Sequence, residues 1–239
     1  MTFIEPLPDV MQEAMNRIVA LPPDEQDRVA QENGYELRVH SRAFDLAAAF
    51  EELEHLLELL QRARTFQEIS LVIKLYIIGW VALSDVFANL INEVFDLGYA
   101  EQDIQFGVIL RNRKIRSSAI PDVVKRHGKL IRYDDYVKRR NDIVHRGRLE
   151  DPELMDVRGE VLTAVVMKTI KVNRNDAAAV AAASREAAME VNAASKMQEL
   201  LRQKKAEFAE HLTATRAMFT EVAPFLIERV KVQPRRATA

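Results

Sequence analysis

The sequence predicts an all-α protein: a helical bundle with helical extensions at its N-terminal and C-terminal ends. Three observations support this fold class. Apolar residues recur at intervals of three and four along most of the 239 residues, as they do on one face of an amphipathic helix. Residues that favour helix starts and helix ends separate these stretches. No segment shows the alternation of apolar and polar residues that is typical of a half-buried strand.

The chain divides into three parts. Residues 1–40, around "LPPDEQ", are predicted to form an N-terminal helical extension of two short helices. Residues 41–172 are predicted to form the central helical domain. Residues 173–239 are predicted to form a C-terminal helical extension, which ends in a disordered basic tail, "KVQPRRATA". Because 48% of the residues are hydrophobic, the chain can bury a substantial core.

The first two helices of the central domain are the longest there. The segment 41–64 carries an apolar stripe with glutamates on its other faces, formed by Phe50, Leu53, Leu57 and Leu60. Thr65 and Glu68 then have the spacing of a capping box, which predicts the start of a second helix. That helix is apolar on most sides and ends at Gly98, so we expect it to be packed on several faces, with Tyr76 and Trp80 in the core.

Two shorter helices are predicted to follow. One covers residues 101–113. The other begins at Pro121, a residue favoured in the first turn of a helix, and ends at His127 before Gly128.

The next predicted helix contains the one segment with a chemical pattern, "RRNDIVHRG" at residues 139–147. Asp134 or Asp135 can cap its start, and Gly147 can end it. A further helix is predicted from Pro152 to about residue 170, despite its β-branched residues.

The C-terminal extension is predicted to be a long helix or a helical hairpin over residues 176–232. Its first third is rich in alanine and has few large apolar residues, so it needs a packing partner to be stable. Pro224 is expected to kink or break this helix, because proline removes a backbone hydrogen bond.

Composition excludes several classes of protein. The chain has no cysteine, which excludes disulfides and thiolate metal sites. Its start lacks the pattern of a secretory signal, and its most apolar window, "LVIKLYIIGWVAL", is too short to span a bilayer and contains Lys74. We therefore predict a soluble cytoplasmic protein with no membrane partner.

The charge is unevenly distributed, although the net charge is only -2. Between Arg111 and Arg148 there are 13 Lys or Arg and 4 Asp, a balance of +9. A basic block inside an acidic chain is a candidate binding site for a polyanion.

Arg140, Asn141 and His145 are the candidate catalytic residues of "RRNDIVHRG". Asn141 and His145 are four residues apart and share a helix face, whereas Arg140 and His145 lie about 140° apart in projection. One helix alone therefore does not make a tight pair of Arg140 and His145. Either the long arginine side chain reaches around the helix, or a two-fold partner brings its own residues to a composite site.

Two histidines and two arginines suit the cleavage of RNA, which carries its own nucleophile in the 2′-OH. A base must accept the 2′-OH proton, an acid must protonate the leaving 5′-oxygen, and a cation must stabilise the charge that builds on the phosphate. Imidazole titrates near neutral pH, and guanidinium matches phosphate oxygens in shape. Such a site needs no metal.

"RRNDIVHRG" resembles the signature of HEPN domains (higher eukaryotes and prokaryotes nucleotide-binding). In that signature an arginine, usually followed by a polar residue, precedes a histidine by four to six intervening residues. Arg140, Asn141 and His145 match it, and the helices of residues 41–172 fit the surroundings. The resemblance implies an all-α homodimer with the motif at its interface. In many members it also implies a metal-independent endoribonuclease, acting as a toxin or an anti-phage effector on tRNA, mRNA or ribosomal RNA.

The motif departs from part of this family at one position. Members that a partner nucleotidyltransferase silences carry a tyrosine two residues after the histidine, where this chain has Gly147. Control by that modification is therefore not expected, although an antitoxin or another regulatory partner fits such an effector. The family often has a polar residue on the second helix that faces the site; Ser84, Asp85 and Asn89 are the candidates, and the choice among them stays open.

The remaining assignments follow from the basic block and from the missing motifs. The candidate RNA-backbone contacts are Lys138, Arg139, Arg146 and Arg148. No glycine-rich phosphate loop and no serine or zinc hydrolase motif is present, so no cofactor and no metal site are predicted. The other histidines show no ligand spacing and are interpreted as surface or interface residues: His40, His55, His127 and His211.

Two alternative functions fit the same sequence. In the first, a non-catalytic HEPN-like module binds nucleic acid, a nucleotide or a protein, and the motif serves dimer packing. In the second, the chain is a helical scaffold whose segment 176–232 pairs with a partner helix.

Overall fold

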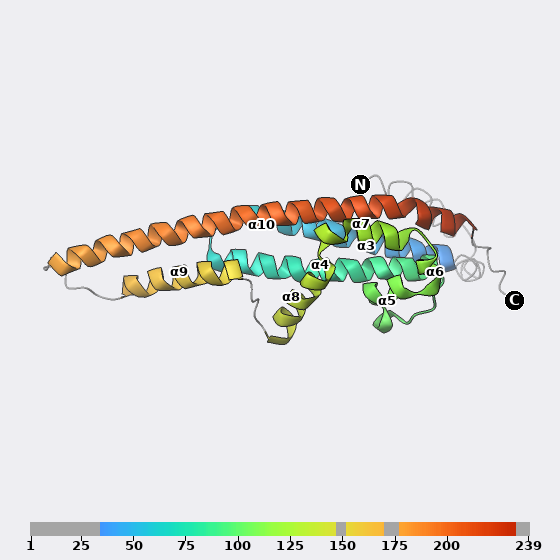
Figure 1. The fold of residues 1–239 in the computed structure, drawn as a ribbon, viewed down its shortest axis with the longest axis horizontal. Helices are drawn as coiled ribbons and strands as arrows, with labels where there is room; N and C mark the ends of the chain where they lie inside the picture. Colours follow the sequence, from blue (N-terminus) through green and yellow to red (C-terminus); the bar gives the residue numbers. More distant parts are fainter. Residues whose placement is uncertain (1–33, 147–151, 170–176, 233–239) are drawn as a thin grey trace, which may run out of the picture. The chain divides into compact units, whose positions relative to one another are not determined.

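The computed structural model describes residues 34–146, 152–169 and 177–232, and the regular structure of these residues is entirely helical. The all-α fold class is therefore confirmed. Figure 1 shows the helices in chain order. They are α3 (Gly34–Arg62), α4 (Phe66–Val94), the short 3-10 helix η1 (Glu101–Asp103), α5 (Phe106–Arg111), α6 (Arg113–Arg116), α7 (Ile120–Ile131), α8 (Tyr133–Arg146), α9 (Pro152–Thr169) and α10 (Ala177–Val232). The predicted helices before Gly34 and the predicted disordered tail lie outside the described residues.

The chain forms two compact units. The first unit comprises Met1–Glu54, Gly79–Tyr133 and His211–Ala239, and the second comprises His55–Ile78 and Asp134–Glu210. Helices α3, α4 and α10 contribute residues to both units.

An aromatic cluster forms the core of the first unit. The rings of Phe87 and Phe219 lie 4.6 Å apart, and the ring of Phe50 lies 6.2 Å from that of Phe219. These rings come from α4, α10 and α3, so the cluster joins all three helices by burial of apolar surface. Trp80 is buried, as predicted, and its indole N–H donates to Oγ1 of Thr215 at 3.3 Å.

His211 contradicts its predicted surface position, because only 2% of its surface is exposed. Its Nε2 lies 2.7 Å from the carbonyl oxygen of Ile131, and its ring centroid lies 4.6 Å from that of Trp80. A buried imidazole needs such a partner. The prediction is also wrong for His40, which is buried in α3.

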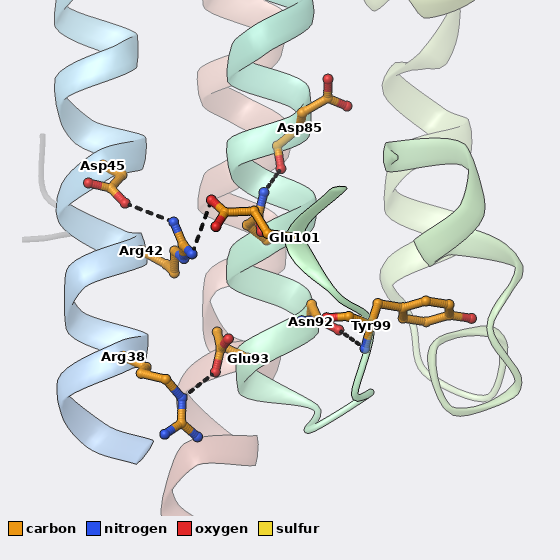
Figure 2. Close-up of polar contacts among 9 residues, drawn as sticks. Arg38, Arg42, Asp45, Asp85, Asn92, Glu93, Tyr99 and Glu101 are labelled. Carbon is orange, nitrogen blue, oxygen red and sulfur yellow. Dashed lines mark hydrogen bonds and ion pairs between the residues drawn. The ribbon is translucent and has the colours of Figure 1, made fainter. Parts of the chain in front are cut away.

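Polar contacts hold the segment after α4 in the first unit (Figure 2). The Asn92 side chain donates to the carbonyl of Tyr99 at 3.3 Å and accepts from the Tyr99 N–H at 3.2 Å. The Arg42 guanidinium lies 3.3 Å from a carboxylate oxygen of Glu101. The Asn92 contacts pair the backbone N–H and carbonyl of Tyr99, which lies outside the helices, and the ion pair joins the side chain of Arg42 in α3 to that of Glu101 in η1.

The second unit has its own core around Tyr76 and Phe208. The two rings stack with centroids 3.7 Å apart, and the Tyr76 hydroxyl donates to the Phe208 carbonyl at 3.2 Å. Burial raises the pKa of the Tyr76 hydroxyl. On its surface, Lys196 of α10 forms ion pairs with Asp156 and Glu160 of α9, at 3.0 and 2.9 Å.

The capping box that begins α4 is confirmed. The Glu68 carboxylate accepts from the Thr65 N–H at 3.0 Å, and the Glu68 N–H donates to Oγ1 of Thr65 at 3.2 Å. The helix from Phe66 to Phe95 is long and apolar enough to cross a membrane, but 56% of its most apolar window is buried inside the protein. The core helix of a soluble protein has the same character.

Three boundary predictions are wrong. The predicted helix over residues 101–113 is instead η1, α5 and the start of α6, because the Asn112 side chain accepts from the Lys114 N–H and begins a new helix there. Helix α7 continues through Gly128 to the buried Ile131 and ends at Arg132 in the left-handed region, with φ 49°. Helix α3 begins at Gly34, before the predicted start at residue 41.

Helix α10 is a single continuous helix, which excludes a hairpin within residues 177–232. It also continues through Pro224, contrary to a predicted break. Val222 and Leu226 are buried on either side of the proline, and this burial can offset the loss of one backbone hydrogen bond.

Candidate functional site on helix α8

Helix α8 carries the predicted motif on its last turns, as expected. Its first turn contains Asp134 and Asp135, and its last turn contains His145 and Arg146. Acidic residues near the start of a helix and basic residues near its end both interact favourably with the helix dipole. Gly147, the predicted end of the helix, lies outside the described residues.

One face of α8 is buried and fixes the direction of the motif. Tyr136 and Ile143 are 1% and 9% exposed. The Tyr136 hydroxyl donates to Glu207 of α10 at 3.5 Å. Because these two residues face inward, the side chains on the opposite side of α8 must point to solvent.

A buried lysine of α10 belongs to a polar network that contacts the buried face of α8. The side chain of Lys204 in α10 is only 4% exposed, and its Nζ lies 2.9 Å from Glu153 of α9 and 3.0 Å from Glu207. Glu207 therefore joins Lys204 to the hydroxyl of Tyr136. A buried ammonium group needs such partners. No pattern in the sequence indicates this network, because it joins residues of three helices, α8, α9 and α10, that are far apart along the chain.

The outward face of α8 consists of four exposed polar residues. They are Asp134, Lys138, Asn141 and His145. Their intervals of four, three and four residues place them in one line along the helix. His145 follows Tyr136 by nine residues and Ile143 by two, which puts it about 160° to 180° from the buried face. The prediction that Asp134 or Asp135 caps the helix is wrong, because α8 already begins at Tyr133 and both residues lie within its first turn. The spacing between Asp134 and His145 is the signal that Asp134 shares this face.

His145 has no hydrogen bond and no ion pair within the part of the chain that the structure describes. Its imidazole is exposed. Both ring nitrogens are therefore accessible to a ligand or to another chain.

Arg140 and Asn141 are brought together, whereas no contact joins either residue to His145 within the described residues. The half-buried Arg140 donates from Nη1 to Oδ1 of Asn141 at 3.0 Å. The guanidinium is thus held toward the outward face, so the arginine side chain reaches partly around the helix.

The predicted RNA contacts fall into two groups. Arg139 forms an ion pair with Asp135 at 3.3 Å and lies 5.9 Å from the centroid of the Tyr136 ring. Arg146 forms an ion pair with Asp142 at 3.2 Å. Lys138 has no ion pair with the described residues, and it shares the face of His145. Arg148 lies outside the described residues.

A comparison with known protein families identifies the family of the chain. The model of the Cthe2314-like HEPN family matches residues 38–209, which is more than two thirds of the chain. The chain belongs to this HEPN family. No curated protein and no solved structure gave a significant match.

The HEPN match includes α8 and continues into α10 as far as residue 209. It therefore covers the whole predicted central domain, residues 41–172, and extends past it on both sides. The division into three parts stays a prediction.

Three residues of the second HEPN helix, α4, were candidates to face the motif, and all three belong to the first unit. The buried Ser84 hydroxyl donates to the carbonyl of Trp80 at 3.2 Å, and the Asn89 side chain donates to the carbonyl of Asp85 at 3.0 Å. Both side chains are thus bonded to their own helix. Figure 2 draws the Asp85 carboxylate directed away from the bond that its carbonyl accepts.

The described residues of the HEPN chain contain no group of three His, Asp or Glu side chains arranged to hold a metal ion. The groups on the outward face of α8 are instead an imidazole, an amide, an ammonium and one carboxylate. This set can accept and donate protons and can bind an anion.

Proposed function

We propose that this HEPN protein is a metal-independent endoribonuclease that acts at a composite site between two copies of the chain. The observation that carries the proposal is the exposed His145, which has no partner among the described residues and lies in line with Asn141 and Lys138. Membership of the HEPN family supports it, because such domains are often ribonucleases. The biological role that fits is that of a toxin or an anti-phage effector.

The proposed reaction begins at the 2′-OH of the RNA. One His145 imidazole accepts the 2′-OH proton while the 2′-oxygen attacks the adjacent phosphorus. The bond from phosphorus to the 5′-oxygen breaks, and the imidazolium form of a second His145 donates its proton to that oxygen and becomes neutral. The products are a 2′,3′-cyclic phosphate and a 5′-OH end. General acid and base groups contribute about 10² to 10⁴-fold each to such steps.

Arg140 and Asn141 have supporting roles in this proposal. The Arg140 guanidinium binds the phosphate oxygens as negative charge builds on them. Asn141 holds that guanidinium through the hydrogen bond of 3.0 Å. Lys138 adds a cation on the same face as His145 and contacts the RNA backbone.

A second copy is part of the proposal because His145 faces outward. The imidazole points away from the buried residues Tyr136 and Ile143, and it has no hydrogen bond or ion pair within the described residues. A two-fold partner would place a second outward face opposite the first and supply the second imidazole.

The test is a cleavage assay on total RNA and tRNA in EDTA, with wild type, Arg140→Ala and His145→Ala. We expect the wild type to cleave and to leave 2′,3′-cyclic phosphate or 3′-phosphate ends. Each variant should lose at least about 100-fold in rate. His55→Ala is the matched control, since it removes another exposed histidine of the second unit.

Unchanged cleavage by His145→Ala would contradict the proposal. Absence of cleavage by a folded wild type, with retained RNA binding, would favour the non-catalytic HEPN-like module instead.

A further inference from the structure

A second cationic region belongs to the first unit, whereas the motif residues of α8 belong to the second. Residues 111–132 contain eight Lys or Arg and one acidic residue, Asp122. All of them belong to the first unit, whereas Lys138, Arg139 and Arg140 belong to the second. The basic block that is continuous in sequence is therefore divided between two units.

Helix α7 is anchored so that two lysines face solvent. Its buried residues are Ile120, Val123 and Ile131. Lys125 and Lys129 lie on the opposite side of the helix and are exposed. Because they are four residues apart, their Cβ atoms are about 6 Å from each other.

Four of the eight cations already have partners inside the first unit. Lys114 donates to the carbonyls of Phe95 and Asp96 at 3.3 and 2.9 Å, where it caps the end of α4. Arg111 donates to the carbonyl of Gly107 at 3.0 Å. Arg126 forms an ion pair with Glu221. Arg132 is the fourth cation that has an interaction partner.

The other four cations are exposed and have no hydrogen bond or ion pair through their side chains within the described residues. They are Arg113, Arg116, Lys125 and Lys129, which we name the α6–α7 cationic surface. Ile120 follows Arg116 by four positions, and Lys125 follows Ile120 by five positions of helix, so the Cα atoms of Arg116 and Lys125 are at most about 22 Å apart.

The carboxylate of Glu221 in α10 is already paired with two residues of α7. Oε1 of Glu221 lies 2.9 Å from Nε2 of His127, and its other oxygen pairs with Arg126. This ion pair holds α7 against α10 within the first unit. The α6–α7 cationic surface is therefore carried on a fixed helix, and its net charge is not cancelled by Glu221.

We propose that the α6–α7 cationic surface binds the phosphodiester backbone of RNA, as a second RNA contact of the chain besides the motif helix. This rests on the proposed function, which names RNA as the substrate. Cations without carboxylate partners release counterions from a nucleic acid when they bind it. A lipid surface fits less well, because α7 exposes only one large apolar side chain, Leu130, for insertion.

The test measures binding of a fluorescent single-stranded RNA to the full chain in the His145→Ala background, over a range of salt concentrations. Lys125→Ala with Lys129→Ala should raise the Kd roughly tenfold at low salt. The slope of log K against log salt should fall by about 1.4, since each lost phosphate contact removes about 0.7 for single strands. Circular dichroism checks that the variant keeps its helix content.

Two controls make the result specific. Arg158→Ala with Arg185→Ala removes the same charge from two exposed positions of the second unit that have no ion pair with the described residues. This variant should change the slope by less than half as much. Asp122→Asn removes the one acidic residue of the region and should tighten binding by about twofold, which a folding defect would not do.

The outcomes separate this inference from the proposed function. Loss of binding in the lysine variant, without any cleavage by the wild type, would support the surface and overturn the nuclease. Wild-type cleavage with unchanged binding in the lysine variant would overturn the surface alone. Lysine-dependent binding to vesicles of phosphatidylcholine and phosphatidylserine, with RNA binding unaffected, would also overturn it.

Discussion

Helices α7 and α8 each carry a histidine in a basic sequence, "VKRHGK" and "RRNDIVHRG", yet the two histidines have different surroundings. His127 of α7 is 15% exposed at its side chain and lies 2.9 Å from Glu221. His145 of α8 is exposed and has no partner among the described residues. The first imidazole helps to fix a helix, whereas the second is accessible to a substrate.

The difference depends on where each histidine lies relative to the buried residues of its helix. His127 follows Ile120 by seven residues and precedes Ile131 by four, so it shares their buried face. His145 lies two residues after Ile143, on the opposite side of its helix. A histidine in a basic helix is therefore a better candidate for function when the apolar residues place it outward.

The largest effect on stability is expected when a substitution on the buried face of α8 is compared with one on its exposed face. Ile143→Ala removes a side chain that is 9% exposed, and Val144→Ala removes one that is 55% exposed. We expect Ile143→Ala to lower the free energy of unfolding by about 2 to 4 kcal/mol, and Val144→Ala by less than about 0.5 kcal/mol. Urea unfolding of both variants measures this. Similar losses at the two positions would contradict the orientation of α8.

A smaller effect on stability is expected from Glu221, which pairs with Arg126 and His127 of α7. Hydrogen bonds from Arg126 and His127 lower the pKa of the Glu221 carboxyl from its ordinary value of 4.5. Glu221 therefore stabilises the folded protein above pH 4.5, and this contribution is lost as the pH falls through the lowered pKa. Glu221→Gln should remove that part of the pH dependence, so the difference in melting temperature from wild type should shrink between pH 5 and about pH 3.

The control for this experiment is Glu228→Gln on the same helix, since the exposed Glu228 has no ion pair within the described residues. Its melting temperature should follow the wild-type curve at every pH. A Glu221→Gln curve parallel to wild type over the whole range would show that the contact with α7 contributes nothing.

Much of the fold could be predicted because it depends on local patterns. The capping box of Thr65 and Glu68, the Pro152 start of α9 and the burial of Trp80 were all evident in the sequence. The errors arose where tertiary burial outweighs a local signal. Helix α7 continues past Gly128 because Ile131 is buried, and α10 continues through Pro224 because residues on both sides of the proline are buried.

The placement of the candidate residues on α8 could be predicted, whereas the surroundings of that helix could not. The spacing of Asn141 and His145 was enough to place them on one face, and the structure agrees. The support of α8 by Lys204 and Glu207 could not be predicted, because it joins residues far apart in sequence. The pairing of Arg139 with Asp135 follows the spacing of four residues that favours ion pairs on a helix.

The central claim is that His145 acts at a site which a second copy completes. It is tested most directly by co-expressing wild type and His145→Ala with different tags, purifying the mixed dimer through both tags, and measuring RNA cleavage in EDTA. Because the proposed site needs an imidazole from each copy, we predict a rate far below half that of the wild-type dimer. A rate of one half would mean that each chain carries a complete site, and failure of the two tagged chains to purify together would mean that the chain does not dimerise; either result would contradict the claim.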